Sequence, residues 1–410
     1  MFMEDKKEKI ISALFLEECK KRNLSSTEFQ NASEFFKEYQ IPFIPTYSPA
    51  SLKVFEKVEY HIYFQENKLA KELLTAFYND KSFYYSYNYP ECLLAKYAIE
   101  ILDHKGNQQN EEQWNSLYEL LDDSKLISFF YFFFGYFYVQ NNLSRKAFTI
   151  FKKGYDKSVL FDTIYMQTLY LFHIGIQNDI EHRLFEALKY YKKVNQQFSL
   201  DNNHLCFNGC TLNITTVYSK LQLRNLSIEC YKKILNSANR FADTHLKNLV
   251  FLNLAFDYLA DKQYSNTIYY VNEGLKLPGV NSFDHYYLAE YYYMLCWAYC
   301  GLNDMPKAKQ AFDKGKKYFP NDVFITNVYR LLEFFIQKDI NSKNFENCLL
   351  ELYQCIDLNN SENEKKLVLE EMCAYYKRIH DYEKVYKYNE EILSILELAD
   401  QAEEDFDEII

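Results

Sequence analysis

The sequence is poor in the residues that form tight turns. It has nine Gly and seven Pro in 410 residues, too few for the many turns of a β-sandwich or β-barrel, whereas long helices joined by short polar loops need few of either. The chain is also longer than roughly 250 to 300 residues, the size at which single hydrophobic cores stop growing. We therefore expect a helical protein made of several domains or of stacked repeats.

Motifs that signal catalysis are missing. There is no G-x-S-x-G, no phosphate-cradling Gly run and no H-E-x-x-H, and the eight His are dispersed. The ten Cys include no C-x-x-C pair, and the closest approaches are Cys206 with Cys210 and Cys296 with Cys300. Structural zinc needs four ligands in recognisable pairs, so burial of small apolar side chains explains the first pair better than a metal site with His204. We expect no enzymatic activity, no metal and no cofactor.

A membrane-spanning segment is not expected either. The most apolar run, residues 126–139, has about 14 residues, whereas a transmembrane helix needs about 20. The first residues place acidic groups on both sides of a short apolar run, which a secretory signal would not tolerate. These features predict a cytoplasmic protein, and the repeat described next gives the apolar run a better interpretation than a membrane helix.

Aromatic residues, by contrast, are abundant, with 39 Tyr and 34 Phe, and a repeat of about forty residues accounts for them. The tetratricopeptide pattern places aromatic, apolar and small residues at fixed positions. One segment fills these positions with Tyr131, Phe134, Gly135, Tyr138, Ala147, Phe151 and Gly154. A second fills them with Tyr292, Leu295, Cys296, Tyr299, Ala308, Phe312 and Gly315. The eighth positions of five successive copies are Gly135, Gly175, Thr215, Ala255 and Cys296.

The repeat predicts the fold. Small residues let two antiparallel helices approach closely, and the rings fill the groove between a pair and its neighbour. We predict an all-α, right-handed superhelix of at least five tetratricopeptide-like helix pairs over residues 125–395, within a repeat domain of residues 81–395. A small helical module precedes it over residues 1–80, and an acidic tail follows over residues 396–410.

Residues 1–80 lie outside the repeat register. Residues 15–32 predict a helix that ends at Asn23, followed by Leu24 to Phe29, where a hydroxyl cap opens a second helix. This order, with N-L-S-S-T-E-F at residues 23–29, resembles the first two helices of the XRE-type helix-turn-helix, commonly G-L-T-x-x-E-L, and residues 47–56 resemble its recognition helix. The resemblance implies DNA contacts from Ser48, Ser51, Lys53 and Lys57. An insertion at residues 36–46 and a nearly neutral charge depart from the pattern, because phosphate binding normally needs a basic face. The alternative is a helical cap that closes the end of the repeat array.

This combination is similar to the RRNPP group of Gram-positive bacteria, the Rgg- and PlcR-like intracellular receptors for short signalling peptides. In that group an Asn at the sixth position of a repeat often hydrogen-bonds the peptide backbone, and Asn213 and Asn253 occupy this position in adjacent repeats. A carboxamide both donates and accepts, as an extended peptide requires. The repeat register places further side chains on the same wall, namely Thr216, Lys220, Phe256, Tyr293 and Trp297. Asn residues that simply face solvent are the alternative, and Lys220 would then be solvated instead of pairing with a peptide carboxylate.

The resemblance implies a receptor for a short linear peptide that regulates transcription by binding double-stranded DNA as a homodimer. An adaptor or inhibitor that binds a partner protein through the same wall, without DNA, is the alternative. A passive assembly scaffold is a third possibility, and it predicts no small peptide ligand.

Overall fold

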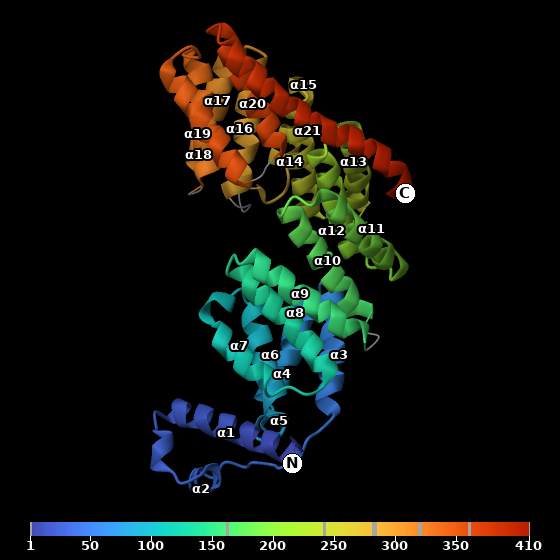
Figure 1. The fold of residues 1–410 in the computed structure, drawn as a ribbon, viewed down its shortest axis with the longest axis vertical. Helices are drawn as coiled ribbons and strands as arrows, with labels where there is room; N and C mark the ends of the chain where they lie inside the picture. Colours follow the sequence, from blue (N-terminus) through green and yellow to red (C-terminus); the bar gives the residue numbers. More distant parts are fainter. Residues whose placement is uncertain are drawn as a thin grey trace. The chain divides into compact units, whose positions relative to one another are not determined.

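A computed structural model describes residues 2–160, 164–240, 243–280, 285–318, 322–359 and 362–409 (Figure 1). Within these ranges the chain is almost entirely helical, and its only β-pairing is an isolated bridge between Ile44 and Ser86. The predicted all-α class is confirmed. The chain divides into two compact units, Met1–Phe207 and Asn208–Ile410, and each is described by itself.

The first unit contains the predicted N-terminal module and the first repeats. Its early helices are α1 (Phe2–Arg22), η1 (Ser26–Glu28), α2 (Ala32–Glu38), α3 (Ala50–Tyr63), α4 (Asn67–Asn79), α5 (Lys81–Tyr84), α6 (Tyr89–Leu102), η2 (Gly106–Gln108) and α7 (Glu111–Tyr118). The paired helices that follow are α8 (Ser124–Gln140) with α9 (Ser144–Val159), and α10 (Ile164–Ile180) with α11 (Leu184–Leu200).

The second unit continues the same pairing. Helix α12 (His204–Lys220) begins just before the boundary and pairs with α13 (Arg224–Arg240). The next pairs are α14 (Thr244–Ala260) with α15 (Tyr264–Leu275), α16 (His285–Gly301) with α17 (Met305–Gly315), α18 (Val323–Gln337) with α19 (Lys343–Asn359), and α20 (Glu362–Arg378) with α21 (Tyr382–Ile409). The single turn η4 (Lys316–Tyr318) follows α17. Of the predicted acidic tail, the side chains of residues 398–410 lie outside the described part of the structure.

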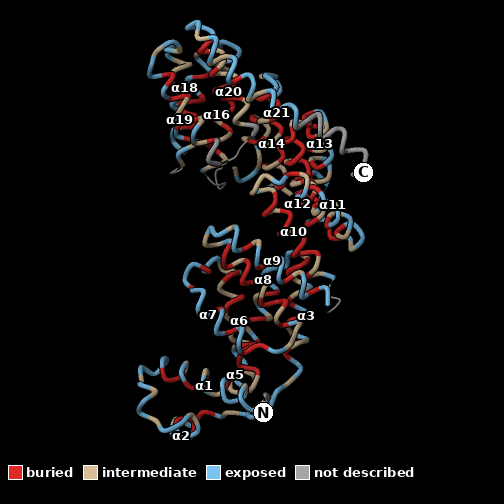
Figure 2. The backbone as a smooth tube through the Cα atoms, in the orientation of Figure 1, coloured by how far each residue is buried: buried red, intermediate tan, exposed pale blue. Residues whose placement is uncertain are grey.

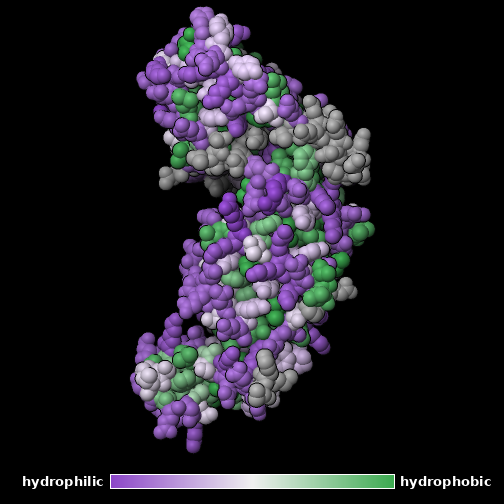
Figure 3. All heavy atoms as spheres, viewed as in Figure 1, coloured by the Kyte–Doolittle hydropathy of each residue, from purple (hydrophilic) through white to green (hydrophobic). Residues whose placement is uncertain are grey.

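The predicted repeat period is confirmed by the helix boundaries. Helices α8, α10, α12 and α14 begin at residues 124, 164, 204 and 244, and α16 begins at residue 285. Figure 2 shows buried residues running along the paired helices of each unit. The face drawn in Figure 3 is covered mainly by hydrophilic side chains, with smaller hydrophobic areas between them. Most helices therefore have a buried side, as stacked helices require, and α14 and α16 are buried or half-buried over almost their whole length.

The turns inside the helix pairs explain how the chain manages with so little glycine. Each ends its first helix with a residue in the left-handed region, where glycine is the usual choice. These residues are Asn142, His182, Gln222, Lys262, Asn303, Lys338 and His380, with φ between 57° and 61°. Polar side chains thus occupy a position that glycine fills in many other proteins.

Where glycine does occur in the repeats, it makes room for a ring. A Cβ atom on Gly274 would overlap the ring and hydroxyl of Tyr291, which belongs to the next helix pair. That hydroxyl donates to the backbone carbonyl of Asn248, at 3.0 Å. The same arrangement joins Gly315 to Tyr329, whose hydroxyl donates to the carbonyl of Ala289 at 3.0 Å. At these two junctions between helix pairs, a tyrosine packs against a glycine that leaves room for its ring.

A size exchange at these positions supports this interpretation. In the repeat before Gly274, the corresponding residue is Ile234, and the residue that corresponds to Tyr291 is Val250. Ile234 and Val250 are buried in one hydrophobic cluster. A small residue therefore faces a large one in two repeats, and two medium-sized residues face each other in the third. Close packing, which leaves few voids in protein interiors, explains the exchange.

Candidate functional site

A small cavity lies on the first helices of the repeats in the second unit. It has a volume of about 130 Å³ and is lined from α12, α13, α14, α16 and α20. Five of the seven side chains predicted to face a peptide line it, namely Thr216, Lys220, Asn253, Phe256 and Tyr293. They meet because residues about forty apart occupy equivalent places on successive helices. The sequence register thus locates this cavity, and its use by a peptide stays a prediction.

The two predicted asparagines differ in their surroundings. Asn253 is half-buried and lines the cavity, whereas Asn213 is half-buried on α12 and does not line it. Among the described residues, neither carboxamide has a hydrogen-bond partner. A half-buried amide without a protein partner can bind a ligand at little cost, because no internal hydrogen bond must first be broken.

Trp297 lies elsewhere. Its side chain is 5% exposed and lines a separate cavity of about 360 Å³, together with Tyr264, Phe335 and Lys338. Its ring centroid lies 5.9 Å from that of Phe335 in an edge-to-face contact. Trp297 therefore does not line the cavity that contains Asn253, although Phe256, at the same repeat position, does. A role for Trp297 in peptide binding stays a prediction.

Two carboxylates that sequence reasoning did not select complete the cavity. Glu290 projects from α16 and Glu364 from α20. Burial, with Glu364 and Asp322 nearby, raises the pKa of Glu290 to about 8. Burial also raises the pKa of Glu364, and the Lys220 ammonium opposes that rise. A cationic ligand group would favour the ionised form of both carboxyls.

The sequence contains a signal for one of these carboxylates only. Glu290 occupies the second position of its repeat, which the register already places on the concave wall. Glu364 lies in the first turn of α20, outside the repeat positions predicted to face a peptide, and α20 contacts α14, three helix pairs earlier. An ion pair between Lys262 and Glu370, at 2.8 Å, also connects these two helix pairs. Local repeat patterns do not encode such a contact between non-adjacent copies.

A buried ionic network forms part of the cavity wall, since Ser219 and Asp257 line the cavity. Asp257 is 1% exposed and accepts hydrogen bonds from Ser219, from Ser227 at 2.6 Å and from Arg224 at 3.1 Å. Burial raises the pKa of Asp257, and the Arg224 guanidinium opposes this rise. The network fixes α13 against α14, because a buried carboxylate is stable only with its partners in place.

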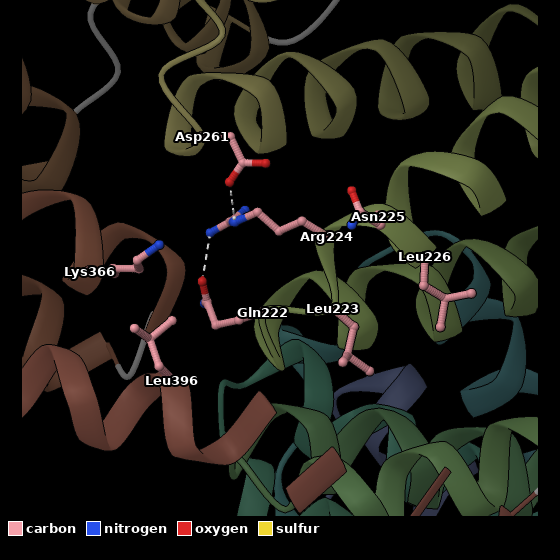
Figure 4. Close-up of a pocket in the computed structure, with 8 residues that line it drawn as sticks. All are labelled: Gln222, Leu223, Arg224, Asn225, Leu226, Asp261, Lys366 and Leu396. Atoms are coloured by element: carbon pink, nitrogen blue, oxygen red, sulfur yellow. Dashed lines mark hydrogen bonds and ion pairs between the residues drawn. The ribbon is translucent and has the colours of Figure 1, made fainter. Parts of the chain in front are cut away.

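Arg224 also borders a neighbouring cavity of about 410 Å³. Figure 4 shows its guanidinium between Asp261 and the amide oxygen of Gln222, at 3.0 and 2.8 Å. Lys366 of α20 and Leu396 of α21 point toward it from the opposite wall. The guanidinium is thus engaged on several sides by protein groups.

The residues predicted to contact DNA lie in the first unit. Lys53 and Lys57 are exposed on α3, and Ser48 is half-buried in front of it. Ser51 is completely buried, and its hydroxyl donates to the carbonyl of Ser48 and accepts from Asn88 at 3.1 Å. The structure therefore corrects one prediction, because a hydroxyl held in this way does not reach a DNA phosphate.

The reason lies in the insertion before α3. Residues 43–49 pair with residues 85–88, where Ile44 donates to the carbonyl of Tyr85 at 2.7 Å and Tyr87 donates to that of Thr46 at 3.2 Å. The second helix predicted from residues 24–29 is a single 3₁₀ turn, Ser26–Glu28, although its capping box between Ser25 and Glu28 is present. The compact three-helix arrangement of a helix-turn-helix is not confirmed.

Two further features, a metal site and a membrane-spanning helix, are not found among the described residues. Among the described residues, no group of three or more His, Cys, Asp or Glu is arranged to hold a metal ion. A membrane-crossing helix would need a longer apolar stretch than any helix in the described ranges provides.

Comparison with solved structures identifies the architecture. A Rap protein complexed with competence and sporulation factor superimposes with a TM-score of 0.63 at 16% identity, covering 86% of this chain and 99% of that one. The apo form of the quorum sensor NprR from B. thuringiensis gives 0.63 at 15% identity, covering 84% and 97%. The fold is that of the Rap and NprR proteins.

A third structure agrees with this assignment. The apo form of RapI superimposes with a TM-score of 0.62 at 12% identity, covering 88% of this chain and 99% of that one. No protein-family model matches the chain, and no curated protein matches it by sequence. At this level of identity the likeness establishes the tetratricopeptide-like fold over nearly the whole chain.

Proposed function

We propose that this chain is a receptor for a short linear peptide and that the cavity between α12, α14, α16 and α20 forms part of the peptide site. The observation that carries the proposal is the half-buried, unpartnered carboxamide of Asn253 beside Lys220, Glu290 and Glu364. A carboxamide binds both the N–H and the C=O of a peptide unit. The chain binds and does not catalyse in this proposal.

The charges in the cavity indicate which peptide it suits. Glu290 and Glu364 line the cavity with one ammonium group, that of Lys220, and the Arg224 guanidinium also opposes the rise in the pKa of Glu364 that burial causes. A basic side chain or an N-terminal ammonium group would relieve the cost of burying two carboxyls together. We therefore propose that the peptide carries a cationic group near the Asn253 contact.

The solved neighbours support a peptide ligand. NprR has been solved in complex with its cognate peptide NprX, and that structure superimposes on this chain with a TM-score of 0.54. The Rap structure described above is likewise a complex with a signalling factor. These complexes make a peptide the first ligand to test for this chain.

A peptide library tests the proposal. A pool of random heptapeptides is passed over the immobilised wild-type chain and over an Asn213→Ala/Asn253→Ala variant, and retained peptides are then titrated by calorimetry. Each unpaired peptide group should cost about 1 to 3 kcal/mol, or roughly five- to 150-fold in affinity. Retention by both proteins alike would reject the asparagine site, and retention by neither would reject the receptor function.

For the output of the receptor, we propose action on a partner protein in preference to DNA. Two observations favour this. Ser51 is buried and cannot contact DNA, and the expected recognition helix then offers only the cations Lys53 and Lys57 for phosphate contacts. Transcriptional regulation by a DNA-binding homodimer is the second candidate. A mobility-shift assay with DNA from upstream of the chain's own gene, at low salt where phosphate contacts are strongest, decides between them. A retarded band that Lys53→Glu abolishes would favour DNA.

A further inference from the structure

A second cavity, of about 400 Å³, lies in the first unit and plays no part in the proposed peptide site. Helix α1, the extended segment before α3, the start of α6 and the turn before α8 enclose it. Its walls are largely apolar or aromatic, formed by Ile10, Tyr47, Tyr87, Pro90, Leu120 and Leu121. A cavity of this size accommodates a small organic molecule.

One oxygen atom of a buried carboxyl group in this cavity lacks a hydrogen bond. Glu91 lies in the first turn of α6 and is 4% exposed. Its Oε2 atom makes no hydrogen bond within the part of the chain that the structure describes. Burying a carboxylate without a partner is costly, since the group loses its hydration and gains nothing in return. Such a group is uncommon in a folded protein and calls for an explanation.

The other charged groups around the cavity are already engaged. Lys6 forms an ion pair with Asp122. Lys7 lies over the ring of Tyr87, 5.3 Å from its centroid. Asp123 caps α8 by accepting from two backbone N–H groups, at 2.8 and 3.2 Å. Three carboxylates thus face two ammonium groups, so the excess charge at the cavity is negative.

We propose that this cavity binds a small organic ammonium ion, whose charged group donates to the Oε2 atom of Glu91. Its apolar body would lie against Ile10, Leu120 and Leu121. The exposed ring of Tyr47 offers a further attraction, because an ammonium group over an aromatic face is stabilised by the ring quadrupole. An anionic ligand is disfavoured, because the excess charge at the cavity is negative.

The ligand's affinity should depend on pH. Burial raises the pKa of Glu91 to about 7, while the Tyr47 hydroxyl and the Lys6 ammonium oppose the rise. The charged or titratable groups that face the cavity with Glu91 are Lys6, Lys7, Tyr47, Tyr87, Asp122 and Asp123. Binding requires the ionised carboxylate, which is the minor form at pH 6 and the major form at pH 8. Affinity should therefore fall about tenfold from pH 8 to pH 6.

Calorimetric titration of the full chain tests this proposal, with 2-phenylethylammonium chloride as the probe and 2-phenylethanol as its neutral counterpart. We expect saturable 1:1 binding of the amine at pH 8 and binding of the alcohol at least tenfold weaker. Glu91→Gln keeps the shape of the side chain and removes its charge, and it should weaken amine binding at least tenfold. Glu112→Gln, an equal charge change at an exposed position on α7, should leave binding unaltered.

Several results would overturn the assignment. The absence of saturable heat with the amine, equal binding of the alcohol, or unchanged binding in Glu91→Gln would each do so. The comparison of amine and alcohol needs only the wild-type chain, so it decides even if the variant fails to fold. Weaker amine binding in Glu290→Gln would place the ligand in the other unit and would also reject this site. Failure of the peptide experiment has no bearing on these outcomes.

Discussion

Two glycines on helices of the second unit should respond in opposite ways to the same substitution. Gly274 faces Tyr291, and a Cβ atom there would overlap the ring and its hydroxyl. Gly209, inside α12, has no atom within 4 Å of the place where its Cβ would be. Gly274→Ala should therefore destabilise the unit, and Gly209→Ala should stabilise it.

The magnitudes follow from the contacts. Tyr291 is completely buried and donates to the carbonyl and to Oδ1 of Asn248, each at 3.0 Å. An extra methyl group in a packed core costs about 1 to 3 kcal/mol, and displacement of the hydroxyl adds about 0.5 to 1.5 kcal/mol. The higher helix propensity of Ala offsets up to about 1 kcal/mol. We expect a net loss of about 1 to 3 kcal/mol for Gly274→Ala and a gain of up to about 1 kcal/mol for Gly209→Ala.

Urea denaturation followed by circular dichroism measures both changes in the free energy of unfolding. A compensating variant sharpens the test, because the natural pair Ile234 and Val250 fills the equivalent space in the preceding repeat. Gly274→Ile should be strongly destabilising alone, and adding Tyr291→Val should restore part of the loss. Equal effects of alanine at Gly209 and Gly274, or additive losses in the double variant, would refute the packing argument.

Three further predictions concern the surroundings of the proposed peptide site. Tyr258→Ala removes a ring that stacks on Tyr270 with centroids 5.4 Å apart, and thermal melts should show a loss of about 3 to 5 kcal/mol. Arg224→Met leaves the buried Asp257 carboxylate without its cation, and denaturant titration should show that the free energy of unfolding falls by about 3 to 5 kcal/mol. An unchanged free energy of unfolding would contradict this role of the ion pair. The folded-state pKa of Glu290, about 8, lies above its value of 4.5 in an unfolded chain, so its contribution to stability is complete below pH 4.5 and is lost as pH rises through 8. Glu290→Gln should reduce the fall in stability between pH 5 and pH 8.5, and an identical pH profile in the variant would contradict this assignment.

The sequence by itself determined the fold class and the repeat period, and its register selected five of the side chains that line one cavity. Scarce glycine and recurrent aromatics reflect local helix formation and packing between adjacent pairs, which repeat every forty residues and are therefore visible as a pattern. The same register brought Thr216, Asn253 and Tyr293 into one cavity. The sequence also contains the size exchange in which Gly274 and Tyr291 replace Ile234 and Val250 of the preceding repeat. The contact between the two positions, which explains this exchange, is visible only in the structure.

Tertiary structure alone decided the features that depend on distant or irregular contacts. Glu364 reaches the cavity because α20 contacts α14, a helix three pairs earlier in the chain. Ser51 is buried because the insertion before α3 pairs with residues 85–88, so a motif that resembles a DNA reader adopts another conformation. The Oε2 atom of Glu91 lies without a hydrogen bond in a cavity formed by four separate segments. Neighbouring residues constrain the backbone of each helix, but long-range packing determines which charged groups lose their solvent.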